Sequence, residues 1–147
     1  MMFYDDLKVG MKYKGLPLTV TESHIVMFGH LTGDLNPIHM DDHFCAQFDF
    51  GRRIAHGMLT SSLAVGCLGP FLNQPNPEGI ATHLEDSYVY RDPVFVGDTL
   101  TTECEVTEME RHSRFGVVKI SYTTRKQDGK VVMYGWTKLG LHYRPKS

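Results

Sequence analysis

The sequence predicts an α+β domain in which an antiparallel sheet curves around one apolar helix. An apolar run over residues 57–72 is long enough for a buried helix but too short to span a membrane. From Ile80 onward the chain alternates between apolar and polar residues, as half-buried strands do. Asp128-Gly129 is a strong signal for a two-residue hairpin between the last two strands. One buried helix followed only by strands fits a sheet that wraps around the helix.

The predicted central helix has only three polar side chains near its start, Thr60, Ser61 and Ser62. Because it is apolar on nearly all sides, we expect the whole helix to be buried. Gly69-Pro70 interrupts the run, since proline lacks the N–H that a helix interior requires.

The predicted strands differ in the number of their apolar faces. Residues 98–107 alternate strictly, so that every second side chain faces the core. The segment from Val131 to His142 is instead apolar on both faces. A curved sheet around one helix buries only one face, so this pattern predicts that another subunit covers the other. We therefore expect a homodimer or a larger homo-oligomer.

The first half of the chain is predicted to contain an edge strand over residues 13–20, weakened by a glycine and a proline. Thr21 is a typical N-cap for a helix that continues to about Leu31 and ends at the glycine that follows shortly after. A second, short helix is expected to begin after Asp41 or Asp42.

Length and composition indicate one domain, residues 1–147, without a nucleic-acid or membrane surface. The 15 basic and 17 acidic residues give a formal charge of −2. The three cysteines lack a paired spacing, which indicates core residues in a reducing compartment. Acidic residues occupy the N-terminal region where a secretory signal would carry basic ones, so we expect a cytoplasmic protein.

The stretch of residues 31–41 gives the clearest indication of function. It places Asp34 and His39 five residues apart, with Asn36-Pro37 between them to favour a turn. The two side chains can therefore converge across one loop, and such a pair suits general acid-base catalysis. The alternative interpretation is structural, because turns and helix caps favour the same residue types.

Three segments carry a resemblance to a known family. They are Gly-Asp-Leu-Asn-Pro-Ile-His at 33–39, Gly-Arg-Arg-Ile-Ala-His-Gly-Met at 51–58 and Tyr-Arg-Asp-Pro-Val-Phe-Val-Gly-Asp at 90–98. Together they resemble the signature of the MaoC-like hydratases and dehydratases, which include the (R)-specific enoyl-CoA hydratases. The resemblance implies a single hot-dog fold. It also implies that Asp34 and His39 hold one water between them for the hydration of trans-2-enoyl-CoA to (R)-3-hydroxyacyl-CoA.

Further residues are assigned to the thioester. Gly57 lies at the predicted start of the central helix, where unpaired N–H groups favour a developing enolate oxygen and glycine permits close approach. Asn36 is interpreted as a scaffold for the loop, with direct substrate contact as the alternative. His56 either orients the turn at Gly57 or fills space beside it. A hydroxyl partner for the catalytic loop is expected among Thr60, Ser61 and Ser62.

No nucleotide-binding motif is present, so we expect no cofactor beyond the coenzyme A of the substrate, whose contacts could come from Arg52, Arg53 and Arg91. A metal site formed by Asp34, His39 and His43 is an alternative, because the two histidines are four residues apart. Pro37 argues against it by placing His39 before the next helix, so we expect no metal. A dehydratase acting on acyl carrier protein and a non-catalytic acyl-thioester-binding protein remain open.

Overall fold

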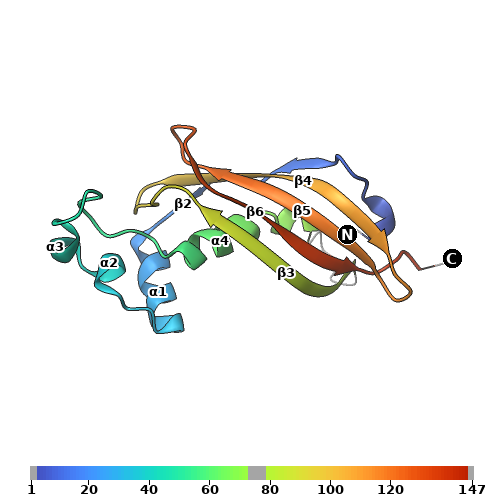
Figure 1. Ribbon diagram of the computed structural model, residues 1–147, viewed down its shortest axis with the longest axis horizontal. Helices are drawn as coiled ribbons and strands as arrows, with labels where there is room; N and C mark the ends of the chain where they lie inside the picture. Colours follow the sequence, from blue (N-terminus) through green and yellow to red (C-terminus); the bar gives the residue numbers. More distant parts are fainter. Residues whose placement is uncertain (1–2, 73–78, 146–147) are drawn as a thin grey trace.

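The computed structural model describes residues 3–72 and 79–145. Its antiparallel sheet has the order β1-β4-β5-β6-β3, and β2 also pairs with β4. The strands are β1 (Lys12–Lys14), β2 (Leu18–Thr19), β3 (Ile80–Tyr90), β4 (Thr99–Arg111), β5 (Gly116–Arg125) and β6 (Val131–Leu141). The helices are η1 (Tyr4–Asp6), α1 (Glu22–Thr32), α2 (Pro37–Met40), α3 (Asp42–Cys45), α4 (Gly57–Gly66) and α5 (Gly69–Leu72). Figure 1 shows the long strands as one curved layer with α4 behind it.

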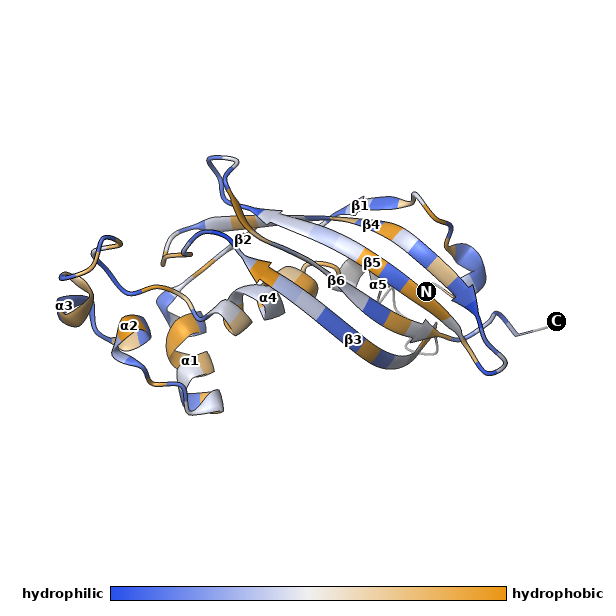
Figure 2. Ribbon diagram, viewed as in Figure 1, coloured by the Kyte–Doolittle hydropathy of each residue, from blue (hydrophilic) through white to orange (hydrophobic). Residues whose placement is uncertain are grey.

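The inner face of the sheet and α4 together form the hydrophobic core. Val106, Val118 and Ile120 are fully buried on the strands, and Leu59 and Ala64 of α4 belong to the same cluster. The predicted alternation along β4 and β5 is confirmed by their burial, and Figure 2 shows the corresponding alternation of hydropathy. Burying such a side chain stabilises a fold by about 1.5–3 kcal/mol. A curved antiparallel sheet around an apolar helix is the hot-dog fold that the sequence predicted.

The central helix is shorter and less buried than its apolar run predicts. It ends at Gly66, where the Leu68 N–H donates to the Val65 carbonyl oxygen in a tighter turn. Pro70 then lies in the first turn of α5, where its missing N–H costs no hydrogen bond. Met58 is 58% exposed. The expectation of burial on all sides is wrong, because one curved sheet covers only one side of a helix.

The predicted edge strand is divided into β1 and β2. A Cβ at Gly15 would lie 2.8 Å from the carbonyl oxygen of Cys67, so the chain between the strands approaches the end of α4 closely. The prediction for α1 is confirmed. Its N-cap Thr21 donates its N–H to Nδ1 of His24 at 3.0 Å, and Gly33 ends the helix with a φ of +80°.

Helices α1, α2 and α3 lie beyond one end of the sheet (Figure 1). The Ala55 N–H donates to the Val94 carbonyl oxygen at 2.7 Å and so joins the segment after these helices to the loop between β3 and β4. Arg53 lies 3.0 Å from a carboxylate oxygen of Glu22 on α1 and 3.2 Å from one of Asp42 on α3. These contacts tie residues 53–55, which lead into α4, to α1, α3 and the loop before β4.

Strand β6 lies inside the sheet, between β5 and β3. Met133 and Leu139 point into the core and are almost fully buried, whereas Tyr134 on the opposite face is 43% exposed. A charged residue at Leu139 would therefore disrupt the core of a single chain and would not report on subunit association. A second subunit over the outer face stays a prediction.

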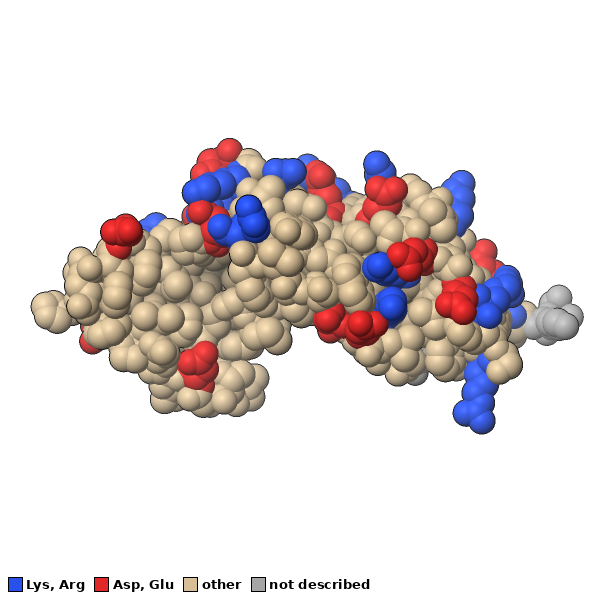
Figure 3. Space-filling view, viewed as in Figure 1, with Lys and Arg blue, Asp and Glu red and all other residues tan. Residues whose placement is uncertain are grey.

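The surface agrees with the nearly balanced composition. On the face drawn in Figure 3, basic and acidic side chains are interspersed rather than separated into patches of one sign. Within residues 3–72 and 79–145, every helix is too short or too polar to cross a membrane.

Candidate active site

The segment after α1 places His39 on a short helix. Asn36 caps α2 through its Oδ1, which accepts the Ile38 N–H at 3.1 Å. Pro37 occupies the first position of α2, where its fixed φ suits a helix start. His39 therefore precedes α3, the short helix capped by Asp41, as predicted, but it lies on a further short helix, α2, that was not predicted. The contact of Asn36 agrees with its interpretation as a scaffold.

His39 presents one ring nitrogen to the carboxylate of Asp34. Its Nδ1–H donates to the Ile54 carbonyl oxygen at 2.8 Å, so the neutral ring has its lone pair on Nε2. Nε2 lies 4.0 Å from Oδ2 of Asp34. This gap is too long for a direct hydrogen bond, but one oxygen atom at about 2.8 Å from each atom can contact both. The pair can therefore hold one water molecule or one hydroxyl group.

His56 supports both members of this pair. Its Nε2–H donates to the backbone carbonyl oxygen of Asp34 at 2.9 Å, and its ring stacks on His39 with centroids 3.8 Å apart and planes 29° apart. Phe28 of α1 packs on the His56 ring as well, at a centroid distance of 5.0 Å. His56 therefore supports the Asp34–His39 turn, a contact that was included in neither of the two roles expected from the sequence.

The surroundings of His39 favour its neutral form. Burial lowers the pKa of His39 below the ordinary value of 6.5, against the hydrogen bond to the Ile54 carbonyl, which raises it. Charge on His56 would lower this pKa further, and the carboxylate of Asp34 raises it. The net lowering keeps the imidazole neutral at pH 7, with a lone pair available to accept a proton.

His39 and Gly57 line the same cavity, whose volume is about 430 Å³. Gly57 is the first residue of α4, where backbone N–H groups have no acceptor within the helix. Thr60 also lines this cavity, and the opposite wall comes from β3, β6 and the loop after β3. His39, one member of the pair, and the start of α4 thus face one space.

The three hydroxyl groups of α4 bond elsewhere than the catalytic loop. Thr60 Oγ1 donates to the His56 carbonyl oxygen at 3.2 Å, and Ser62 Oγ donates to that of Met58 at 2.7 Å. Ser61 Oγ donates to the same Met58 oxygen at 3.0 Å and lies 3.1 Å from the hydroxyl of Tyr90. Among the hydrogen bonds of the described residues, therefore, the expected direct hydroxyl partner of the Asp34–His39 loop is not found.

The three arginines have different surroundings. Arg53 is committed to its ion pairs with Glu22 and Asp42, and the Glu22 contact raises the pKa of Arg53. Arg91 lines the cavity that holds His39. Arg52 lies over the ring of Phe95, 4.3 Å from its centroid. Only Arg91 thus lies directly at the candidate site.

Sequence reasoning missed the contacts that hold the cavity wall at residues 92–98. Lys126 Nζ lies 2.7 Å from Asp92 and 3.7 Å from Asp98, and it donates to the Pro93 carbonyl oxygen at 3.1 Å. A charged group with so little exposure needs such partners. The Pro-Val-Phe-Val-Gly-Asp motif contains Asp98, but no local pattern indicates a lysine from the hairpin between β5 and β6.

Asp34, His39 and His56 also place possible metal-ligand atoms within 4.8 Å of one another. His43, which the sequence suggested, does not belong to this group. The two imidazoles are stacked, so their in-plane lone pairs run side by side instead of converging on one point. This arrangement suits a proton-transfer pair better than a metal centre.

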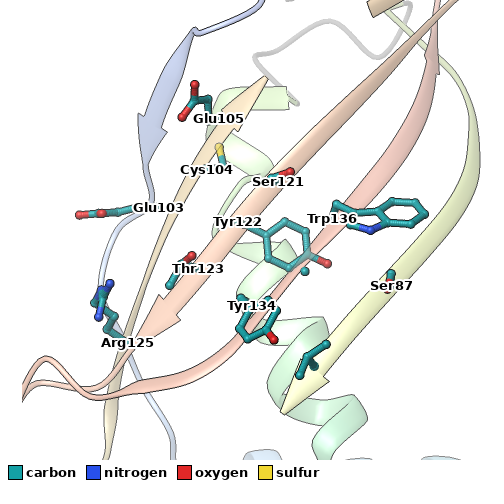
Figure 4. Close-up of a pocket in the computed structure, with 12 residues that line it drawn as sticks. Ser87, Glu103, Cys104, Glu105, Ser121, Tyr122, Thr123, Arg125, Tyr134 and Trp136 are labelled. Carbon is teal, nitrogen blue, oxygen red and sulfur yellow. The ribbon is translucent and has the colours of Figure 1, made fainter. Parts of the chain in front are cut away.

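A larger groove, of about 520 Å³, crosses the outer face of the sheet (Figure 4). Its acidic side chains are engaged in ion pairs, Glu103 with Lys14 at 3.0 Å and Glu105 with Lys12 at 3.5 Å. The rest of its lining is mainly hydroxyl-bearing and aromatic, including Tyr134. Because no proton-transfer pair faces this groove, the smaller cavity at His39 is the better candidate for catalysis.

Comparison with known proteins identifies the family. The model of the MaoC like domain matches residues 6–127. The chain is 37% identical over 109 residues to the 3-hydroxybutyryl-CoA dehydratase of Methylorubrum extorquens, an alignment that covers 74% of this chain and 66% of that protein. It is 32% identical over 133 residues to the (R)-specific enoyl-CoA hydratase of Rhodospirillum rubrum, covering 90% of this chain and 87% of that one.

The fold is likewise shared with a solved hydratase. The unliganded R-hydratase of Pseudomonas aeruginosa superposes with a TM-score of 0.80 at 30% sequence identity. The superposition covers 96% of this chain and 86% of the hydratase. The hot-dog architecture therefore extends over nearly the whole length of the chain.

Proposed function

The chain belongs to the MaoC-like dehydratase family and is a carbon–oxygen lyase, and on this premise we propose that it reversibly hydrates trans-2-enoyl-CoA to (R)-3-hydroxyacyl-CoA. The observation that carries the proposal is the 4.0 Å gap between His39 Nε2 and Asp34 Oδ2, at the cavity shared by His39 and Gly57. A water molecule in this gap contacts both groups while the substrate occupies the cavity.

In the proposed reaction one water molecule supplies both the hydroxyl group and the hydrogen that are added across the double bond. Its oxygen bonds to the β-carbon, one of its protons is accepted by the Asp34–His39 pair, and a proton from the pair reaches the α-carbon. The carbon–carbon double bond is lost and the pair returns to its starting state. His39 can accept the proton because its Nε2 carries a lone pair, and Asp34 can do so through its carboxylate. Which group acts first is left open.

The Gly57 N–H is proposed to stabilise the enolate oxygen that forms between these two steps. It combines an N–H without an intrahelical acceptor with the positive end of the α4 dipole. Removing one such donor typically costs about 10²-fold or more in rate. No cofactor is required, since coenzyme A is part of the substrate. Arg91 is the nearest candidate to bind its polar groups.

Two other functions are alternatives to this proposal. A dehydratase of 3-hydroxyacyl chains on an acyl carrier protein would use the same Asp34–His39 pair in reverse and differ only in the carrier. A non-catalytic thioester-binding protein would have no use for a histidine held neutral beside a carboxylate. The neutral His39 beside the Asp34 carboxylate therefore favours an enzyme over a binding protein.

A homodimer or larger assembly is also proposed. Strand β3 pairs with β6 along one edge, and no other strand of the described residues pairs with its second edge. Exposed apolar residues lie on this strand, Leu84 at 47% and Val89 at 37%, and Met58 is exposed nearby in α4. A free edge with apolar side chains favours pairing with another strand. Light scattering should give at least twice the chain mass, and a monomer mass at micromolar concentration would contradict this proposal.

The deciding experiment is an ultraviolet assay of double-bond loss. Crotonyl-CoA and a longer 2-enoyl-CoA are compared with the same acyl groups on acyl carrier protein, and the stereochemistry of each 3-hydroxy product is determined. We expect turnover of the coenzyme A thioesters and an (R) product. Faster turnover on acyl carrier protein would favour the alternative carrier. Binding without turnover of either thioester would favour a non-catalytic protein.

A further inference from the structure

Tyr90, at the end of β3, contacts the residue whose N–H is proposed to bind the thioester oxygen. A Cβ added to Gly57 would lie 3.1 Å from Cε2 and from Cζ of the Tyr90 ring. The ring therefore occupies the space beside the Gly57 Cα. Tyr90, Gly57 and His39 all line the cavity of about 430 Å³, so the ring forms part of its wall.

The hydroxyl of Tyr90 is tethered to α4. Ser61 is 1% exposed, and its Oγ–H donates to the Met58 carbonyl oxygen at 3.0 Å. The Oγ atom of Ser61 can then accept the hydroxyl proton of Tyr90, whose oxygen lies 3.1 Å away, and Sδ of Met58, also on α4, lies 3.5 Å from the same oxygen. This chain of hydrogen bonds fixes the ring against the first turn of the helix. Without the tether, a tyrosine that is 43% exposed could turn away from Gly57.

We infer that Tyr90, held by Ser61, is a specificity-determining wall that selects against thioesters branched at the α-carbon. The inference rests on the proposed function, because it assumes that the carbonyl oxygen lies at the Gly57 N–H. With the oxygen there, the groups next to the carbonyl carbon are the sulfur and the α-carbon. The sulfur side is the same in every thioester, so the variable bulk near the ring comes from the α-carbon.

The expected selectivity is moderate, because it arises from one methyl group in an apolar contact. Such differences change kcat/KM by roughly 10–200-fold. The parent protein should therefore prefer crotonyl-CoA to trans-2-methylcrotonyl-CoA by about this range. Replacing the ring by a smaller side chain should reduce the preference about tenfold, mainly by improving the branched substrate.

The test compares Tyr90→Leu with Tyr134→Leu. Tyr134 has the same exposed fraction as Tyr90, 43%, but lies in the groove on the outer face of the sheet. The ratio of kcat/KM for the two substrates should fall in Tyr90→Leu and stay at the parent value in Tyr134→Leu. An unchanged ratio in Tyr90→Leu, or an equal fall in the control, would overturn the inference.

Two conservative variants test the tether and remain available if Tyr90→Leu does not fold. Ser61→Ala and Tyr90→Phe each remove one side of the hydrogen bond, so each should lower the ratio by the same few-fold. Their double variant should be no worse than either one. Ratios equal to the parent in both single variants would show that Ser61 does not position Tyr90.

A binding measurement separates this inference from the proposed function. Butyryl-CoA and 2-methylbutyryl-CoA are saturated and cannot be hydrated, so calorimetry reports their fit alone. Weaker binding of the branched thioester, relieved by Tyr90→Leu, would support the wall even if crotonyl-CoA is not turned over. Turnover of crotonyl-CoA with equal binding of both saturated thioesters in parent and variant would support the function and contradict the wall.

Discussion

The first turns of α2 and α4 face the same cavity but contribute to it in different ways. In α2 the functional groups are side chains, since His39 and the preceding Asp34 offer an imidazole and a carboxylate 4.0 Å apart. In α4 the proposed functional group is a backbone N–H at Gly57, whose surroundings are set by Tyr90. A substitution at Asp34 or His39 therefore removes a proton-transfer group. A substitution near Gly57 leaves the backbone N–H in place and acts only by adding or removing side-chain volume.

His56 joins the two regions. It is the N-cap of α4, and its ring extends back to stack on His39 and to bond the Asp34 carbonyl oxygen. A displacement of either helix start would therefore be transmitted to the other through one buried side chain. The following predictions test whether the two regions act as separate parts of one site.

The largest effects are expected in α2. Asp34→Asn and His39→Ala should each lower hydration by about 10²–10⁴-fold, because each removes a proton-transfer group. If the two residues share one water, the double variant should be hardly worse than either single one. Steady-state kinetics with crotonyl-CoA measures the losses. His43→Ala is the matched control, since this exposed histidine of α3 lies outside the cluster.

Two results would change this assignment. Strictly multiplicative losses in the double variant would show that Asp34 and His39 act in separate steps. Activity within tenfold of the parent in either single variant would remove that residue from the mechanism.

In α4, Gly57→Ala should lower kcat/KM by about 10²-fold through displacement of the donor, because the new Cβ meets the Tyr90 ring. The double variant Gly57→Ala/Tyr90→Leu should recover part of this loss, because the smaller side chain gives the Cβ room. Recovery would show that Tyr90 sets the requirement for glycine. No recovery would show that the thioester itself needs the space.

The link between the regions should appear in the pH dependence. Because burial lowers the pKa of His39, loss of activity through its protonation should occur below pH 6.5. His56→Asn shortens the stacked side chain and admits water beside His39, so this acidic limb should move upward, toward 6.5. Profiles of kcat/KM against pH measure the shift. If His56→Asn lowers activity but leaves the acidic limb of the profile at the same pH, His56 acts only by holding the Asp34 carbonyl.

How well the sequence predicts a feature depends on how far apart in the chain the interacting residues are. Strand alternation, the Thr21 cap and the stop at Gly33 depend on neighbours in the chain, and the structure confirms them. The end of the central helix and the exposure of Met58 depend on how much of α4 the sheet can cover. That coverage is a property of the folded sheet and leaves no local pattern.

The same distinction applies to the site. The convergence of Asp34 and His39 was predicted because five residues and a turn connect them, and the 4.0 Å gap bears it out. The stack of His56 on His39 and the contact of Tyr90 with Ser61 join residues 17 and 29 positions apart. Their partners could not be chosen from residue types alone. Ser61, one of the three residues expected to offer a hydroxyl group to the loop, contacts Tyr90 instead.

The smallest effect concerns Asn36, whose Oδ1 caps α2 by accepting the Ile38 N–H at 3.1 Å. Asn36→Ala should cost about 0.5–2 kcal/mol of unfolding free energy and lower activity by a few-fold, because His39 sits on the helix that loses its cap. Asn36→Asp keeps the acceptor oxygen and should stay close to the parent in denaturant unfolding and in kcat/KM. If Asn36 instead contacts the substrate through its amide N–H₂, Asp would be as damaging to kcat/KM as Ala while leaving stability unchanged.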